Sequence, residues 1–183
     1  MFEAMVDPTA GPAATAAVPR LATRPARLDG LVVGLVANPK KNAEPFLDAV
    51  GELLAAEHGT ADVVRTRKTS ITDPIAPAVL DELAQRCDVV LIGVGDCGSC
   101  SAAAVADGIA FEAAGVPAAV ICTDAFRVSA DAMARLQGSP GYTYVTTAHP
   151  LAPLDADGVR DRARLALPEL VGMLSSAVPA VAR

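Results

Sequence analysis

The sequence predicts an α/β fold: one doubly wound sheet of five parallel strands with helices on both faces. Short apolar runs alternate five times with longer stretches whose apolar residues recur at helical spacing, which is typical of a parallel sheet with right-handed crossovers. Several of the short runs are apolar throughout, as expected of strands covered on both faces. A flavodoxin-like sheet with strand order 2-1-3-4-5 is the natural arrangement.

The expected elements alternate along the chain after residue 30. Strands are predicted at residues 31–37, 61–66, 88–94, 116–123 and 142–147, and helices at 42–57, 76–86, 99–114, 129–136 and 155–175. The third helix is expected to end at Gly115, because glycine favours helix termination. Pro117 lies near the start of its strand, where a missing N–H matters least. Pro168 is expected to kink or restart the last helix.

The chain of 183 residues is long enough for one domain with a substantial core. Residues 1–28 are rich in Ala, Pro and Thr and show no sustained period. We therefore expect an extended N-terminal tail at residues 1–28, packed across a neighbouring chain, and a single α/β domain over residues 29–183.

The composition argues against several classes of function. A net charge of −6 disfavours nucleic acid or an anionic membrane as a partner. No apolar run is long enough to span a membrane, and Glu3 and Asp7 interrupt the N-terminus, which argues against a signal peptide. We therefore expect a cytoplasmic protein. The four cysteines indicate catalytic or buried thiols, and two histidines are too few for a zinc site, so no metal or cofactor is expected.

The most informative motif is a pair of cysteines three residues apart. Cys97-Gly98-Ser99-Cys100 follows the predicted strand at 88–94 and opens the next predicted helix. A thiol in the first turn of a helix meets unpaired backbone N–H groups and the positive end of the helix dipole, and both favour the nucleophilic thiolate. Cys100 lies on the same side of that turn, where it can close a disulfide or resolve an adduct. The alternative is that two small side chains simply pack at this junction.

The same motif resembles that of the UGSC family, in which the first motif position is selenocysteine in some members and cysteine in others. The likeness covers most of the chain and rests on segments in the same order, at residues 24–30, 37–43, 67–68, 95–101, 122–126 and 149–151. It implies that Cys97 occupies the selenocysteine place and attacks a small activated substrate. The motif is also distantly similar to the selenocysteine loop of the glycine and betaine reductase B subunits. Other members usually carry an aromatic residue and a histidine in the next helix, where this chain has residues 102–106 and no histidine.

Ligands of open α/β sheets bind beyond the carboxyl ends of the strands, near the switch in strand order. The residues that follow the predicted strands would therefore share one rim. We expect the catalytic residues to be Cys97, Cys100, His149, Asp124 and Asp96. We expect the substrate-binding residues to be Asn38, Lys40, Lys41, Ser99, Ser101, Cys122 and Thr123.

Most of these candidates also have a structural interpretation. Asp96 either moves protons or caps the third helix, and a carboxylate beside Cys97 disfavours its thiolate. Asp124 is an acid, a base or a substrate anchor, or else forms an Asx turn. His149 is a general acid or base, or else holds a turn. Cys122 ends a buried strand, a position more typical of a core residue. The lysines either bind a carboxylate or phosphate of the substrate or are simply solvated.

Together these residues predict a cysteine-dependent enzyme that performs thiol-based redox chemistry on a small molecule. Cys97 would attack, Cys100 would resolve the product, and His149 with Asp124 or Asp96 would move protons. Two alternatives stay open: a lyase, hydratase or cyclase that acts by reversible thiol addition, and a partner subunit of a heteromeric enzyme. We expect a dimer of identical or related chains, because the alanine-rich third helix offers a flat surface to another backbone.

Overall fold

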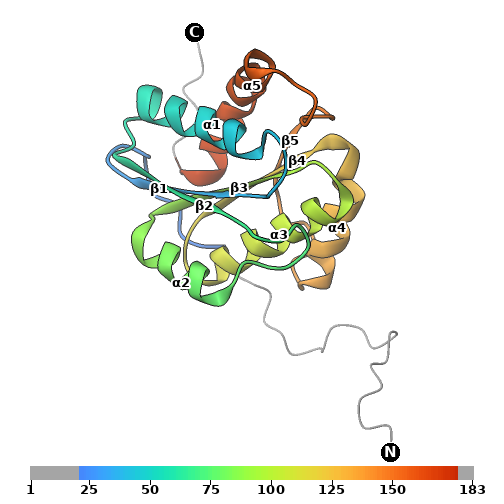
Figure 1. Cartoon of the computed structure of the whole chain (residues 1–183). Coiled ribbons are helices and arrows are strands. Elements are labelled where there is room, and N and C mark those ends of the chain that lie inside the picture. The colour runs from blue at the N-terminus through green and yellow to red at the C-terminus, as the bar shows by residue number, and fades with distance from the viewer. Residues whose placement is uncertain (1–20, 177–183) are drawn as a thin grey trace, which may run out of the picture.

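The computed structural model describes residues 21–176 and confirms the predicted α/β architecture. Five parallel strands form a flavodoxin-like sheet in the order β2-β1-β3-β4-β5 (Figure 1). The strands are β1 (Val32–Ala37), β2 (Asp62–Arg67), β3 (Val89–Gly95), β4 (Ala118–Thr123) and β5 (Val145–Thr147). The helices are α1 (Ala43–His58), α2 (Pro77–Arg86), α3 (Gly98–Ala113), α4 (Arg127–Leu136) and α5 (Ala156–Leu174), with the 3-10 helix η1 (Asp124–Phe126) before α4.

Helices cover both faces of the sheet. Helices α1 and α5 lie on one face, and α2, α3 and α4 lie on the other (Figure 1). Each face has its own apolar cluster, with Phe46 of α1 and Leu170 of α5 in the first and Phe111 of α3 in the second. Strand β3 lies between the two clusters and is buried along its whole length, which explains why its sequence is an uninterrupted apolar run.

Some element boundaries differ from the prediction. Strand β5 is shorter than residues 142–147 because it is an edge strand that pairs with residues 121–123 of β4, while Tyr142 and Tyr144 pack into the apolar cluster under α3. Helix α4 begins at Arg127, directly after η1. Helix α5 continues through Pro168 because Leu167 and Leu170, on either side of it, are buried against the sheet.

The parallel arrangement brings the carboxyl ends of the strands to one edge. Ala37 of β1 lies opposite Gly93 of β3, and Gly95 of β3 lies opposite Cys122 of β4. Cys122 in turn lies opposite Thr146 of β5. The segments that follow β1, β3, β4 and β5 therefore emerge side by side, as the rim argument from the sequence requires.

Part of the predicted tail, residues 21–28, lies against the domain. The Arg24 guanidinium donates hydrogen bonds of 2.7 Å to both carboxylate oxygens of Glu112 on α3, and its Nε donates to the carbonyl of Met173 at 3.0 Å. Glu112 also accepts the backbone N–H of Ala118 at 2.9 Å, and Leu28 is buried in the first apolar cluster. This segment thereby connects α3, β4 and α5. The rest of the predicted tail, residues 1–20, lies outside the described residues.

Within residues 21–176, none of the helices combines the length and the apolar character that a membrane crossing needs.

Candidate functional site

The chain turns directly from β3 into α3, and Gly95 makes this turn possible. A β-carbon on Gly95 would lie 2.6 Å from Ser101 Oγ and 2.7 Å from Ser101 Cα, so a larger residue would push the first turn of α3 away from the sheet. The pairing of β3 with β4 also shifts between Ile92 and Gly95, and such irregularities re-aim the chain next to functional sites. As a result, Asp96 and Cys97 leave the sheet at its carboxyl edge.

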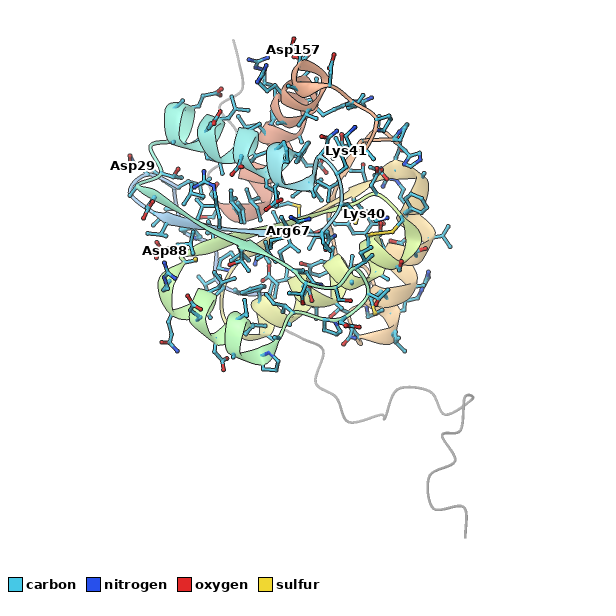
Figure 2. All side chains as sticks on the ribbon, viewed as in Figure 1. Asp29, Lys40, Lys41, Arg67, Asp88 and Asp157 are labelled. Atoms are coloured by element: carbon cyan, nitrogen blue, oxygen red, sulfur yellow. A yellow bond between two sulfur atoms is a disulfide. The ribbon has the colours of Figure 1, made fainter. Side chains whose placement is uncertain are left out.

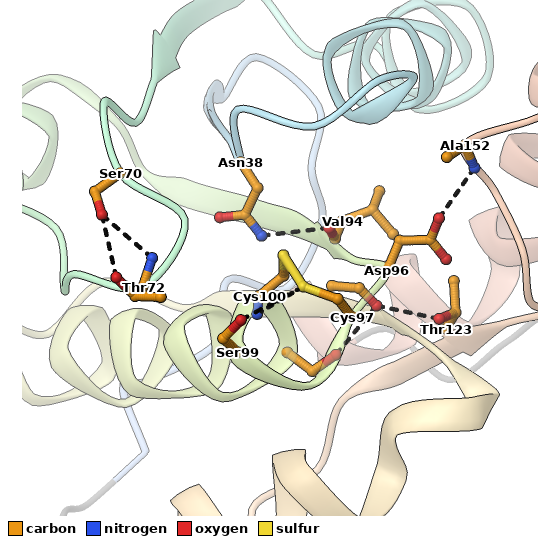
Figure 3. The surroundings of a disulfide bond; sticks show 12 residues. Asn38, Ser70, Thr72, Val94, Asp96, Cys97, Ser99, Cys100, Thr123 and Ala152 are labelled. Atoms are coloured by element: carbon orange, nitrogen blue, oxygen red, sulfur yellow. Dashed lines mark hydrogen bonds between the residues drawn. A yellow bond between two sulfur atoms is a disulfide. The ribbon is translucent and has the colours of Figure 1, made fainter.

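Cys97 and Cys100 form a disulfide at the N-terminus of α3 (Figure 3). Their Cα atoms are 5.2 Å apart, within the range that a disulfide spans. Cys97 is the N-cap of the helix, and its Sγ accepts the backbone N–H of Cys100 at 3.3 Å. Ser99 is exposed, and its Oγ lies 3.6 Å from the same Sγ. Cys97 is half-buried whereas Cys100 is fully buried. A reagent from solvent therefore reaches the sulfur of Cys97 first.

The structural interpretation of Asp96 as the cap of α3 is wrong, because Cys97 holds that position. The Asp96 carboxylate, only 6% exposed, points instead toward the loop that follows β5 and away from the disulfide (Figure 3). Its Oδ1 lies 2.9 Å from His149 Nδ1, and the backbone N–H groups of Leu151 and Ala152 donate to it at 3.0–3.3 Å. The negative charge is thus held by three residues of this loop, directed away from the thiol of Cys97.

The contacts of His149 fix the proton on one nitrogen of its ring. The hydroxyl of Thr123 donates to the carbonyl of Gly95 at 3.2 Å, so it accepts at its 3.2 Å contact with His149 Nδ1. The carboxylate of Asp96 also accepts from Nδ1, at 2.9 Å. Nδ1 therefore carries a proton that both oxygens share. This leaves Nε2, which makes no hydrogen bond to any of residues 21–176, free to take or give a proton.

The loop that carries His149 is held by residues from two other segments, η1 and the turn before α1. Asp124 Oδ1 accepts the backbone N–H of His149 at 3.0 Å, and the ring of Phe126 meets the imidazole edge-on with centroids 5.2 Å apart. Asn42 Nδ2 donates to the carbonyls of Leu151, Ala152 and Leu154 at 2.9–3.2 Å. Sequence reasoning missed Asn42 and Phe126. The signal for Asn42 was weak: asparagine tolerates the left-handed backbone conformation found there, with φ 68°.

Asn38 follows β1 and is fully buried beside the disulfide (Figure 3). Its side-chain Nδ2 donates to the carbonyl of Val94 at 3.3 Å. Its Oδ1 is buried and has no hydrogen-bond donor among the described residues. A buried carbonyl that stays without a donor costs roughly 1–3 kcal/mol of stability, so a donor from outside the described residues would stabilise this atom.

The lysines of the rim differ in their surroundings. Lys40 is half-buried and Lys41 exposed, and neither ammonium group has an ion pair within residues 21–176. Figure 2 shows both after the end of β1, with Arg67 at the end of β2. Lys68 is different, because it is buried and forms an ion pair with Asp107 of α3. Burial raises the pKa of Asp107, and its hydrogen bond to Lys68 acts in the opposite direction.

Three of the candidate side chains point into the protein. Ser101 is fully buried, and its hydroxyl donates to the carbonyl of Gly95 at 3.1 Å. Cys122 is buried, and desolvation raises the pKa of its thiol to about 12. Thr123 is buried between Gly95 and His149. Ser101 and Thr123 thus both hold the end of β3 at the Gly95 carbonyl, and Thr123 also contacts the His149 ring.

Comparison with known proteins identifies the family on most of the chain. The model of the UGSC family matches residues 4–176. This chain belongs to the UGSC family. No curated protein matches the sequence. A solved structure described as an ABC transporter permease from the Pseudomonas fluorescens group shares 16% sequence identity with a TM-score of 0.39. The likeness covers 78% of this chain and 32% of the length of that protein. The similarity to the glycine and betaine reductase B subunits stays a prediction.

Proposed function

We propose that this UGSC protein is a thiol-dependent oxidoreductase that reduces a small molecule with the electrons of the Cys97–Cys100 dithiol. The observation that carries the proposal is the asymmetry of the pair. Cys97 caps α3 and is half-buried, whereas Cys100 is fully buried within disulfide distance of it. A reachable sulfur at a helix N-terminus suits the attacking thiolate, and a buried neighbour suits the resolving thiol.

The reaction proceeds in two displacement steps that balance. In the first, the Cys97 thiolate attacks an electrophilic atom X of the substrate X–L; the Sγ–X bond forms, the X–L bond breaks, and L leaves with the electron pair and takes a proton. In the second, the Cys100 thiolate attacks Cys97 Sγ; the disulfide forms, and X leaves with its electron pair and a second proton. Two thiols are oxidised, and X–L is reduced by two electrons to X–H and L–H. An external thiol then restores the dithiol.

The Asp96–His149 pair supplies the protons for both leaving groups. Nδ1 of His149 is held by Asp96 and Thr123, so proton exchange takes place at Nε2. When Nε2 accepts the proton of the Cys97 thiol, the imidazolium that forms is stabilised by the buried Asp96 carboxylate at 2.9 Å. The imidazolium then donates this proton to L, and in the second step the proton of the Cys100 thiol passes through the same nitrogen to X. The role of Asp124 is to position His149 through its backbone N–H.

The substrate is a small molecule that approaches the first turn of α3 from solvent. Ser99 is exposed there and lies 3.6 Å from Cys97 Sγ. Lys40 and Lys41, which follow β1, contribute positive charge at the same edge of the sheet (Figure 2). A thiol addition without net oxidation would need Cys97 alone and gives no role to the buried Cys100. The pairing of the two sulfurs in a disulfide therefore favours redox chemistry.

A single-turnover measurement tests the proposal. The fully reduced protein, freed of reductant, is mixed with hydroxyethyl disulfide, and the released mercaptoethanol and the intact mass of the protein are measured. The natural chain should release two molecules of mercaptoethanol and form the Cys97–Cys100 disulfide. Cys100→Ser should release one and retain the other as a mixed disulfide on Cys97. Cys97→Ser should release none on the same time scale. Unchanged release by Cys97→Ser would contradict the proposal.

A further inference from the structure

The amide of Asn38 is held in one orientation. Its backbone N–H donates to the carbonyl of Gly93 at 2.6 Å, and its own carbonyl accepts the N–H of Lys40 at 2.8 Å, so the main chain is fixed between β1 and β3. The side-chain Nδ2 donates to the carbonyl of Val94 at 3.3 Å. Rotating the amide would place Oδ1 against that carbonyl, and two acceptors cannot share a hydrogen bond. The carbonyl of the side chain therefore faces away from Val94.

The atom left over is a buried acceptor beside the reactive sulfurs. Asn38 is fully buried, and Oδ1 has no donor among residues 21–176. Figure 3 shows the amide next to the Cys97–Cys100 bond, with its oxygen turned toward the side of the loop that carries Ser70 and Thr72. The hydroxyl of Ser70 and that of Thr72 bond within their own loop and do not reach it. The fold thus leaves this buried acceptor without a donor among the described residues.

We infer that Asn38 Oδ1 accepts a hydrogen bond from the substrate, and that the substrate carries an N–H or O–H group close to the atom that Cys97 attacks. The inference rests on the proposed function. It defines the substrate class as small molecules with a hydroxyl, amide or ammonium group at this place. A carboxylate or ether oxygen there would face another acceptor and leave Oδ1 unsatisfied, and a buried polar group without its partner discriminates strongly between otherwise similar ligands.

Two small disulfides that differ in one donor test the inference. Hydroxyethyl disulfide carries hydroxyl donors, whereas methoxyethyl disulfide has the same chain with ether oxygens only. The rate of oxidation of the reduced protein is measured with each, and the ratio of the two rates is compared among variants. Methyl methanethiosulfonate, which has no N–H or O–H group, verifies that Cys97 is reactive in each variant.

For the natural chain, the rate with the hydroxyl compound divided by the rate with the ether should be about ten times the same ratio for free dithiothreitol. Asn38→Leu, which removes the acceptor and keeps a similar side-chain volume, should bring the ratio to that of the free thiol. Thr72→Val is the matched control, because it removes a nearby hydroxyl that bonds within its own loop, and it should keep the natural ratio.

Equal rates for the two disulfides in the natural chain would overturn the inference, even where Asn38→Leu does not fold. A ratio that survives in a folded Asn38→Leu protein would also overturn it. If Asn38→Leu slows both disulfides by the same factor, Asn38 serves the sulfur pair and the inference is wrong. If the natural chain oxidises with neither disulfide, the proposed function fails and this inference fails with it. The last outcome is distinct, because only there does Cys97–Cys100 oxidation not occur at all.

Discussion

At the scale of single residues, the four cysteines differ in chemistry because they differ in position. Desolvation raises the pKa of Cys87 to about 11 and that of Cys122 to about 12, so both remain thiols at neutral pH. Cys100 is also buried, but it lies within bonding reach of Cys97. Cys97 combines partial exposure with the N-cap position of a helix of 16 residues. Of the four, it is therefore the one suited to attack a substrate.

The proton-transfer role of His149 predicts an effect that depends on the leaving group. His149→Gln should slow the reaction of Cys97 with a dialkyl disulfide by about 10²-fold, because an alkyl thiolate needs a proton as it leaves. With an activated aromatic disulfide, whose leaving thiolate is stable without a proton, the loss should be much smaller. Asp96→Asn should show the same selectivity, because it weakens the hold on Nδ1. Stopped-flow rates of single-turnover oxidation measure both effects.

A control variant separates this role from a structural one. His58→Gln changes the other histidine, which ends α1 just before β2, at the amino-terminal edge of the sheet. This variant should leave both rates unchanged. If His149→Gln slows the two kinds of disulfide equally, the residue acts by holding the loop after β5, and its role as a proton donor is excluded.

Several site residues were predictable from sequence, and the reason is topological. The carboxyl ends of parallel strands meet at one edge, so Asp96, Asp124 and His149 were brought together although they are far apart in the chain. The direction of each side chain was not predictable. The N-cap role of Cys97, rather than Asp96, depends on how closely α3 starts after Gly95. That distance is a property of the packed structure.

At the scale of elements, α3 is positioned by its small residues. Ala103, Ala104 and Gly108 are buried, and the helix packs on β3, β4 and α4. A β-carbon on Gly108 would collide with Val120 of β4 and lie 2.5 Å from the hydroxyl of Tyr142. The close approach of α3 to the sheet therefore depends on this glycine, and with it the placement of Cys97 at the rim.

Replacing this glycine should destabilise the protein although alanine is the better helix former. Gly108→Ala should lower the free energy of unfolding by about 1–3 kcal/mol through overpacking. Gly172→Ala in α5 is the matched control: nothing lies within 4 Å of its β-carbon, so it should raise the free energy of unfolding by roughly 0.5–1 kcal/mol. Urea unfolding of the three proteins measures both changes. A Gly108→Ala protein as stable as the natural chain would contradict this packing account.

At the scale of the whole molecule, alternating periodicity was sufficient to predict the fold. The continuous apolar runs indicated strands that are buried on both faces. In a sheet of order 2-1-3-4-5, right-handed crossovers then place α1 on one face and α2, α3 and α4 on the other. The exact ends of β5 and α4 were not predictable. They depend on edge pairing with β4 and on the 3-10 turn at Asp124–Phe126, which leave no periodic signal.

The predicted dimer stays a prediction, and the structure changes the argument for it. The alanine-rich side of α3 is largely used by its own sheet, which removes much of the flat surface on which the expectation rested. The larger exposed apolar side chains include Val128 and Leu136 of α4, at 80% and 70% exposure. Light scattering of the full chain and of a chain without residues 1–20 checks the assembly. A monomer in both forms, with full activity, would contradict the dimer.

The central claim is that Cys97 is the activated thiol of this protein, and competitive labelling tests it most directly. The reduced protein is treated with a limiting amount of iodoacetamide at several pH values, and labelling at each cysteine is quantified by peptide mapping. At neutral pH, Cys97 should be labelled far faster than Cys87 and Cys122, whose buried thiols have raised pKa values of about 11 and about 12. Labelling of Cys97 no faster than that of Cys87 would contradict the claim.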